Sequence, residues 1–466
     1  MAAVNSPEHT SRRPLAGFPW LTALVVYTVS WGWSLIRPNT LYWDDWAYIY
    51  NRPKSYLNEI FLKTGLPPWR ALIDQELLGI GYWTIRWLTF FMFFAAGLFL
   101  FEILRKIPYI SSVQSRSIVL LFLILPLNHA RVPMVMFGYS TSYFLFFLAW
   151  MLLVRYSSWI AYISAFICFT WSFMTHSFLI FTALPIVHFA YFHREQLMCK
   201  RPNRKTFVQF ILLLGSPVFY YILRSIYWPP DAEYLWYHTI YFRGVIVALV
   251  YFIPFIVAAF GLVLWLRSGK RLSSKALLIT MGFLAFAVGV FPYLSSGNLD
   301  SRTTLLFWEL DWTSRHQLLM PLGAAAITVA IANFISENKS QTILAVVSAV
   351  MISLNIFWGI GTYVDSVKKV ELEELLSIEL AGDPSRSYVF VDETRHFNFR
   401  GSAYRLYEFA GHVSNAGNVP VPDVRYECGE AVNQTEVVIS SEKGLFEAFF
   451  SGNLGLRLEI GPCKSS

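Results

Sequence analysis

QTILAVVSAVMISLNIFWGIGT, residues 341–362, is an apolar run without a single charged side chain. As a helix, a run of about 20 such residues crosses the hydrocarbon core of a bilayer, which is about 30 Å thick. Further runs of this kind bring the predicted number of transmembrane helices to about 11. The predicted spans are 17–36, 83–104, 117–136, 139–154, 158–175, 177–192, 207–226, 245–266, 276–295, 318–335 and 341–362.

The composition excludes a soluble protein. Of 466 residues, 55% are hydrophobic and only 14% are charged, whereas soluble domains carry about 25% charged residues. We therefore expect an all-α polytopic membrane protein, with a transmembrane domain over residues 1–362. The apolar run near the N-terminus has no clear cleavage site, so it is predicted to be an uncleaved first helix rather than a signal peptide.

The net charge of +7 is distributed in a way that favours a membrane over nucleic acid. Basic residues cluster in alternate loops of the predicted topology: Arg12 and Arg13, Arg105 and Lys106, Arg155, 193–205, 267–275 and Lys339. By the positive-inside rule these loops are cytoplasmic. The N-terminus is then cytoplasmic and everything after Tyr363 is extracytoplasmic, in a protein of the inner-membrane type.

Residues 363–466 are predicted to form a small extracytoplasmic α/β domain. The charged amphipathic stretch VKKVELEELLSIEL (367–380) precedes three β-like runs, SYVFVDE (387–393), EVVIS (436–440) and LGLRLEI (454–460). Cys428 and Cys463 share this domain, and a disulfide between them is expected in an oxidising compartment. The alternative is two unpaired thiols, because spacing alone does not show proximity.

The first external loop, 37–82, is longer than a connection between helices needs to be. Tyr56, Leu57, Ile60 and Phe61 recur at helical spacing, which predicts a short interfacial helix, and a second is expected over residues 69–78. Two later external loops, 227–243 and 296–317, are also both aromatic and polar. Three such loops would be able to roof one cavity.

The segment YWDDW (42–46) carries the strongest functional signal. Asp44 and Asp45 are adjacent carboxylates at the predicted membrane boundary, where charges are usually functional or paired. The alternative is an aspartate pair that only anchors the end of the first helix in water. Because adjacent side chains diverge on a regular helix or strand, we expect one carboxylate to face a cavity and the other to cap or pair nearby.

YWDDW and the layout of the first 110 residues or so resemble the GT-C superfamily of membrane glycosyltransferases. This group includes protein O-mannosyltransferases, the aminoarabinose transferase of lipid A and glucosyltransferases that modify O-antigen. The resemblance implies a polyprenyl-phosphate-linked sugar donor, an external glycan, lipid or protein acceptor, and an acidic residue of the first loop as general base. It favours Asp44 over Asp45. The pair is not the separated DxD of some members, so a divalent metal is only one possibility.

Such a transfer also needs cations for the leaving polyprenyl phosphate, and arginine matches phosphate oxygens with paired donors. The candidates for binding substrate or phosphate are Arg70, His176, Arg302, Arg315 and His316. Arg131 and Arg243 also lie on the predicted external side. For each arginine the alternative is a side chain that extends to lipid headgroups, and for His176 it is a turn residue without a catalytic role.

Two other functions are alternatives to glycosyl transfer. A transporter or flippase of lipid-linked saccharides would place charges near the bilayer centre, whereas the predicted spans are nearly free of charge there. An O-antigen polymerase or ligase would be expected to use a large later external loop rather than an acidic first loop.

Overall fold

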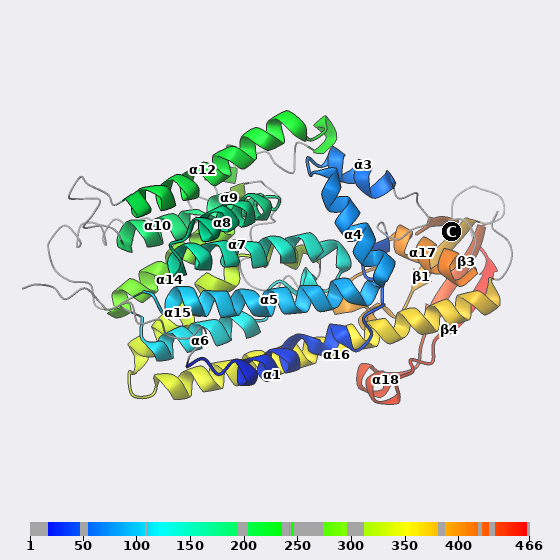
Figure 1. Cartoon of the computed structure of the whole chain (residues 1–466). Helices are drawn as coiled ribbons and strands as arrows, with labels where there is room; N and C mark the ends of the chain where they lie inside the picture. Colours follow the sequence, from blue (N-terminus) through cyan, green and yellow to red (C-terminus); the bar gives the residue numbers. More distant parts are fainter. Residues whose placement is uncertain are drawn as a thin grey trace, which may run out of the picture.

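The computed structural model describes residues 17–46, 55–107, 110–192, 204–234, 242, 244–246, 274–295, 312–380, 387–417, 422–427 and 434–463. A bundle of helices forms one part, and a small sheet with its own helices lies beyond one end of the bundle (Figure 1). The helices of the bundle that matter below are α1 (Trp20–Trp31), α5 (Tyr82–Leu104), α6 (Ser112–Ile124), α7 (Phe137–Arg155), α8 (Trp159–Ser172), α9 (Ser177–Phe181), α10 (Ala183–Phe192), α12 (Arg204–Tyr227), α14 (Ser274–Ser295), α15 (Met320–Ile335) and α16 (Ser340–Glu379).

Five helical segments of the described residues are long and apolar enough to cross a membrane, and four shorter apolar helices accompany them. The chain is therefore a helical membrane protein, but a count of about 11 spans is not confirmed. Most of the predicted span 245–266 lies outside the described residues.

Two predicted spans are interrupted. The prediction of one span over 117–136 is wrong, because α6 ends at Ile124, shortly before Pro126. Proline has no N–H and disfavours helical backbone in the residue before it, so a helix ends there. The chain then forms two short 3₁₀ helices, η2 (His129–Arg131) and η3 (Met134–Met136). The predicted span 177–192 is divided between α9 and α10.

The loop 37–82, which is predicted to be external, contains the two expected short helices, α3 (Ser55–Lys63) and α4 (Pro68–Ile80). Pro68 is the first residue of α4, where its missing N–H costs no helical hydrogen bond. Figure 1 shows both helices at the end of the bundle that also carries the sheet.

Helix α16 connects the bundle to the C-terminal domain without a break. Its 40 residues extend from the apolar run at 341–362 through the amphipathic stretch at 367–380, so the two predicted segments form one helix (Figure 1). The three predicted strands are confirmed as β1 (Ser387–Asp392), β3 (Gln434–Ser440) and β4 (Arg457–Pro462).

The sheet has the order β2-β1-β3-β4. The short strand β2 (Asp423–Arg425), which was not predicted, pairs parallel with β1; β3 also pairs parallel with β1, and β4 pairs antiparallel with β3. Helices α17 (Leu406–Gly417) and α18 (Leu445–Ser451) complete the domain. Cys463 takes part in a disulfide, and the predicted partner, Cys428, lies outside the described residues.

Candidate functional site

The YWDDW segment forms a tight turn in which the two carboxylates separate. Trp43 has a left-handed backbone (φ 49°), and the Asp45 N–H donates to the Tyr42 carbonyl at 3.0 Å. A non-glycine residue in this conformation is uncommon and needs support from its surroundings. The turn directs Asp45 into the bundle and leaves Asp44 partly exposed, with 31% of its side chain accessible.

Asp45 is fully buried and fully engaged. Its carboxylate accepts hydrogen bonds from the backbone N–H groups of Tyr42 (3.1 Å) and Val135 (3.0 Å). The guanidinium of Arg86 on α5 lies 3.3 Å away and also donates to the backbone carbonyls of Pro38, Thr40 and Val132. Burial raises the pKa of Asp45 to about 6, although Arg86 opposes the shift. This pair fastens the turn to α5 and to the segment before α7.

Asp44 is held by the C-terminal domain. Its Oδ1 accepts a hydrogen bond from the Tyr407 hydroxyl and another from Arg405 Nη1 at 3.3 Å. Tyr407 is on α17 and Arg405 directly precedes that helix. Burial and the neighbouring carboxylate both raise the pKa of the Tyr407 phenol, so this hydroxyl stays protonated as a donor.

Trp43 connects a second arginine, Arg315, to the same place. The guanidinium carbon of Arg405 lies 5.2 Å and that of Arg315 5.0 Å from a ring centroid of Trp43. Arg315 and His316 are in η5 (Trp312–Gln317), and Arg315 Nε is 3.4 Å from His316 Nε2. The predicted residues Asp44, Arg315 and His316 are therefore linked through Trp43 and Arg405, and these residues are called the Asp44 cluster below.

Two of the other predicted binding residues, Arg70 and His176, form a second cluster around Tyr220 of α12, on which Arg70 acts electrostatically. His176 Nε2 lies 3.2 Å from the Tyr220 hydroxyl. The buried Arg70 side chain occupies the space beside Gly138, where a Cβ would lie 1.1 Å from Arg70 Nη2. Gly138 is thus the residue that makes room for Arg70.

Tyr293 on α14 connects the two clusters. Its hydroxyl donates to Ser177 Oγ at 3.2 Å, next to His176 in the chain, and its ring centroid is 5.3 Å from that of His316. Tyr293 thus links the start of α9 to η5 through these two contacts.

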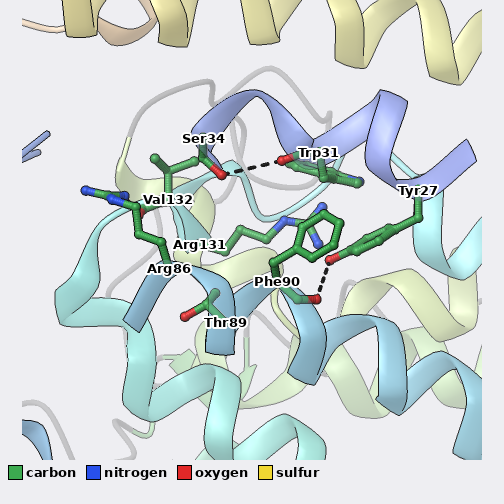
Figure 2. A pocket seen from close by; sticks show the side chains of 8 residues that line it. All are labelled: Tyr27, Trp31, Ser34, Arg86, Thr89, Phe90, Arg131 and Val132. Atoms are coloured by element: carbon green, nitrogen blue, oxygen red, sulfur yellow. Dashed lines mark hydrogen bonds between the residues drawn. The ribbon is translucent and has the colours of Figure 1, made fainter. Parts of the chain in front are cut away.

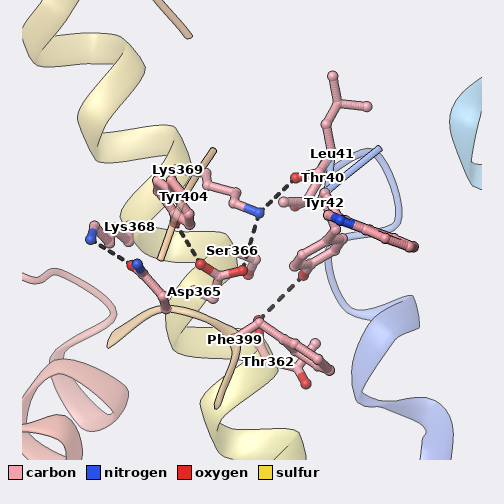
Figure 3. Close-up of polar contacts among 12 residues, drawn as sticks. Thr40, Leu41, Tyr42, Thr362, Asp365, Ser366, Lys368, Lys369, Phe399 and Tyr404 are labelled. Atoms are coloured by element: carbon pink, nitrogen blue, oxygen red, sulfur yellow. Dashed lines mark hydrogen bonds and ion pairs between the residues drawn. The ribbon is translucent and has the colours of Figure 1, made fainter. Parts of the chain in front are cut away.

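A buried ionic layer on α16 fixes the C-terminal domain against the first loop (Figure 3). Lys369 Nζ donates to the Leu41 carbonyl at 2.8 Å and pairs with Asp365 at 3.1 Å. The Tyr404 hydroxyl donates to Asp365 at 2.6 Å. One turn of helix therefore contacts both the residue before YWDDW and the segment that leads to Arg405.

Arg302 lies outside the described residues, as does Arg243. Within the described ranges, no group of three or more His, Cys, Asp or Glu side chains is arranged to hold a metal ion.

Three residues of the site were not predicted. Arg86 had a visible signal, since an arginine in an apolar run needs a partner. Arg405 and Tyr407 had no such signal. They follow Asp44 by 361 and 363 positions, and nothing in the sequence relates residues that far apart.

Comparison with known proteins assigns no relative. No known protein family matches the sequence, and no curated protein is significantly similar to it. Any functional conclusion therefore rests on the YWDDW segment and on the geometry around it.

Proposed function

We propose that this protein is an inverting glycosyltransferase of the GT-C type, which moves a sugar from a polyprenyl-phosphate carrier to an extracytoplasmic glycan, lipid or protein. The observation that carries the proposal is the position of Asp44. It is a partly exposed carboxylate in the first loop, in one cluster with Arg315 and Arg405. A base beside cations is the combination that this transfer needs.

In the proposed reaction, Asp44 accepts the proton of the acceptor hydroxyl while the acceptor oxygen attacks the anomeric carbon. The bond between that carbon and the phosphate oxygen breaks on the opposite face, which inverts the configuration. Arg315, together with Arg405, stabilises the negative charge that develops on the leaving polyprenyl phosphate. Asp45 is assigned a positioning role, because Arg86 and two backbone N–H groups already use its carboxylate.

The test compares Asp44→Asn with the wild-type protein. Asparagine keeps the shape of aspartate but removes its basicity, so turnover should fall by about 100-fold or more. Membranes containing the protein are incubated with polyprenyl-phosphate sugars labelled in the sugar, and transfer to endogenous acceptors is measured. Binding of farnesyl phosphate, a short carrier analogue, should be retained.

Asp45→Asn distinguishes the positioning role of Asp45 from the general-base role of Asp44. Because it leaves Arg86 buried beside a neutral amide, we expect it to lower the thermal unfolding midpoint as well as the activity. If Asp44→Asn folds, binds the analogue and transfers sugar at the wild-type rate, the proposal fails and a transporter of lipid-linked saccharides becomes the better interpretation.

A further inference from the structure

Arg131 is a cation inside the bundle that takes no part in the two clusters described above. It is the last residue of η2, and its guanidinium carbon lies 3.0 Å from a ring centroid of Trp31 and 5.0 Å from that of Phe93. Aromatic faces attract a cation, but they are poor hydrogen-bond acceptors. The buried Nε of Arg131 has no hydrogen-bond partner in the described part of the chain.

Among the described residues, no opposite charge compensates that of Arg131 either. The ionisable groups that act on it are two phenols, Tyr27 and Tyr143, and no carboxylate of the described residues is among them. The nearby pair of Arg86 and Asp45 neutralises itself. Arg131 is partly buried. Arginine does not lose its proton in proteins, and a charge removed from water normally needs an opposite charge.

Two small cavities flank this guanidinium. One, of about 20 Å³, is lined by Arg131 together with Tyr27, Trp31, Arg86 and Thr89, among others. The side chain of Arg131 runs between Trp31 and Phe90 there (Figure 2). The other, of about 10 Å³, is lined by Arg131, Asn128 and Tyr143 with apolar neighbours. About 10–15 Å³ is room for one water-sized particle, so neither cavity admits a sugar or a lipid phosphate.

We propose that Arg131 holds a small monovalent anion, of the size of chloride, in the cavity between α1 and α5. A water molecule would accept the hydrogen bond of Nε but would leave the positive charge without an opposite charge. An anion accepts the hydrogen bond and also neutralises the charge. The anion stabilises the junction of α1, α5 and η2 and has no part in sugar transfer, so this inference is independent of the proposed function.

The test measures the thermal unfolding midpoint of the purified full chain while chloride replaces gluconate at constant ionic strength. Because a ligand that binds only the folded state raises the midpoint, wild-type protein should show a saturable rise of about 2 °C. Arg131→Met should show none. Arg116→Gln, which removes an exposed cation from α6, is the matched control and should respond like the wild type.

Equal responses in all three proteins, or no response in the wild type, would overturn the proposal. If Arg131→Met does not fold, the test uses crystals of the wild-type protein soaked in bromide. An anomalous peak beside Arg131 is expected. If no such peak is found, the cavity holds water alone and the proposal is wrong.

Discussion

At the scale of single residues, the environment of Asp44 depends on side chains of the C-terminal domain. Tyr407 and Arg405 both bind Oδ1, and this fixes the rotation of the carboxylate. A base that must reach a hydroxyl within about 3 Å benefits from such support. In the proposed reaction Tyr407 is a positioning residue, and Arg405 has a second role in stabilising the leaving phosphate.

Tyr407→Phe should lower kcat by about 10-fold with little change in KM, since a hydrogen bond to a charged group contributes about 1.5–3 kcal/mol. Arg405→Gln should raise KM for the donor as well. Sugar transfer from labelled donor measures both.

Each variant has a matched control in the same domain. Tyr426 donates to the Tyr404 carbonyl at 3.0 Å, and Arg425 pairs with Asp423 at 3.0 Å, neither in contact with Asp44. Tyr426→Phe and Arg425→Gln should keep wild-type kinetics. If the control variants lose as much sugar transfer as the test variants, general destabilisation explains the loss, and the positioning role is wrong.

Glu408 is a buried carboxylate whose titration should make stability depend on pH. It accepts hydrogen bonds from the N–H groups of Trp43 (3.2 Å) and Arg405 (3.0 Å). Burial raises its pKa from 4.5 to about 7, against the attraction of Lys369. Between these values the folded state holds a proton that the unfolded state has lost, so stability falls as pH rises through this window. The full loss is about 3 kcal/mol.

Glu408→Gln imitates the protonated form and should remove this loss. Unfolding midpoints from pH 4.5 to 7.5 should fall in the wild type and fall less in the variant. The remaining slope should lie below about pH 6, where Asp45 titrates in the same direction. A variant with the wild-type slope near neutral pH would exclude Glu408 as the titrating group.

At the scale of elements, α16 and α17 determine where the C-terminal domain sits. Lys368 on α16 binds Asp392 of β1 at 2.8 Å and Asn398 at 2.6 Å, while its neighbour Lys369 reaches the first loop. Consecutive lysines on one helix thus hold the sheet on one side and the YWDDW turn on the other. Helix α17 packs directly on that turn, with His412 4.6 Å from Trp46, ring to ring.

Gly411 permits this packing. A Cβ at Gly411 would lie 2.3 Å from the Trp46 ring. Gly411→Ala should therefore destabilise the protein by about 1–3 kcal/mol through overpacking, although alanine within a helix normally stabilises it by about 0.5–1 kcal/mol. Thermal unfolding measures the change.

The control is Gly461→Ala, since a Cβ at Gly461 would have no atom within 4 Å. It should leave the unfolding midpoint close to the wild-type value. A stabilised Gly411→Ala protein would mean that α17 does not pack closely on Trp46.

At the scale of the whole molecule, the Asp44 cluster, the second cluster and the C-terminal domain all lie at one end of the bundle. At the other end, Glu102 pairs with Arg105 and Arg155, two of the basic residues predicted to be cytoplasmic. The proposed function, catalysis at one face of a membrane, requires such a distribution.

The topology predicts that the loop before α16 and the C-terminal domain lie on opposite sides of the membrane. Asn338→Cys and Glu447→Cys place thiols at exposed positions in each. In intact cells, a membrane-impermeant maleimide should label Glu447→Cys above the wild-type background and should not label Asn338→Cys. If Asn338→Cys and Glu447→Cys are both labelled from outside, the predicted placement of the loop before α16 is wrong.

The sequence by itself determined the helical membrane class, α3 and α4, and three of the four strands. These features depend on local periodicity and on the length of apolar runs, which a single chain displays directly. It also indicated that Asp44 and Asp45 would diverge, because adjacent side chains rarely share an environment.

Only the tertiary structure decided which carboxylate is buried. Arg86 reaches Asp45 because α5 packs beside the first loop, and Tyr407 reaches Asp44 because the uninterrupted α16 brings the C-terminal domain back onto it. The spacing of residues along the chain does not predict such contacts. They arise when packed helices satisfy buried charges with whatever partner the fold brings within hydrogen-bond distance.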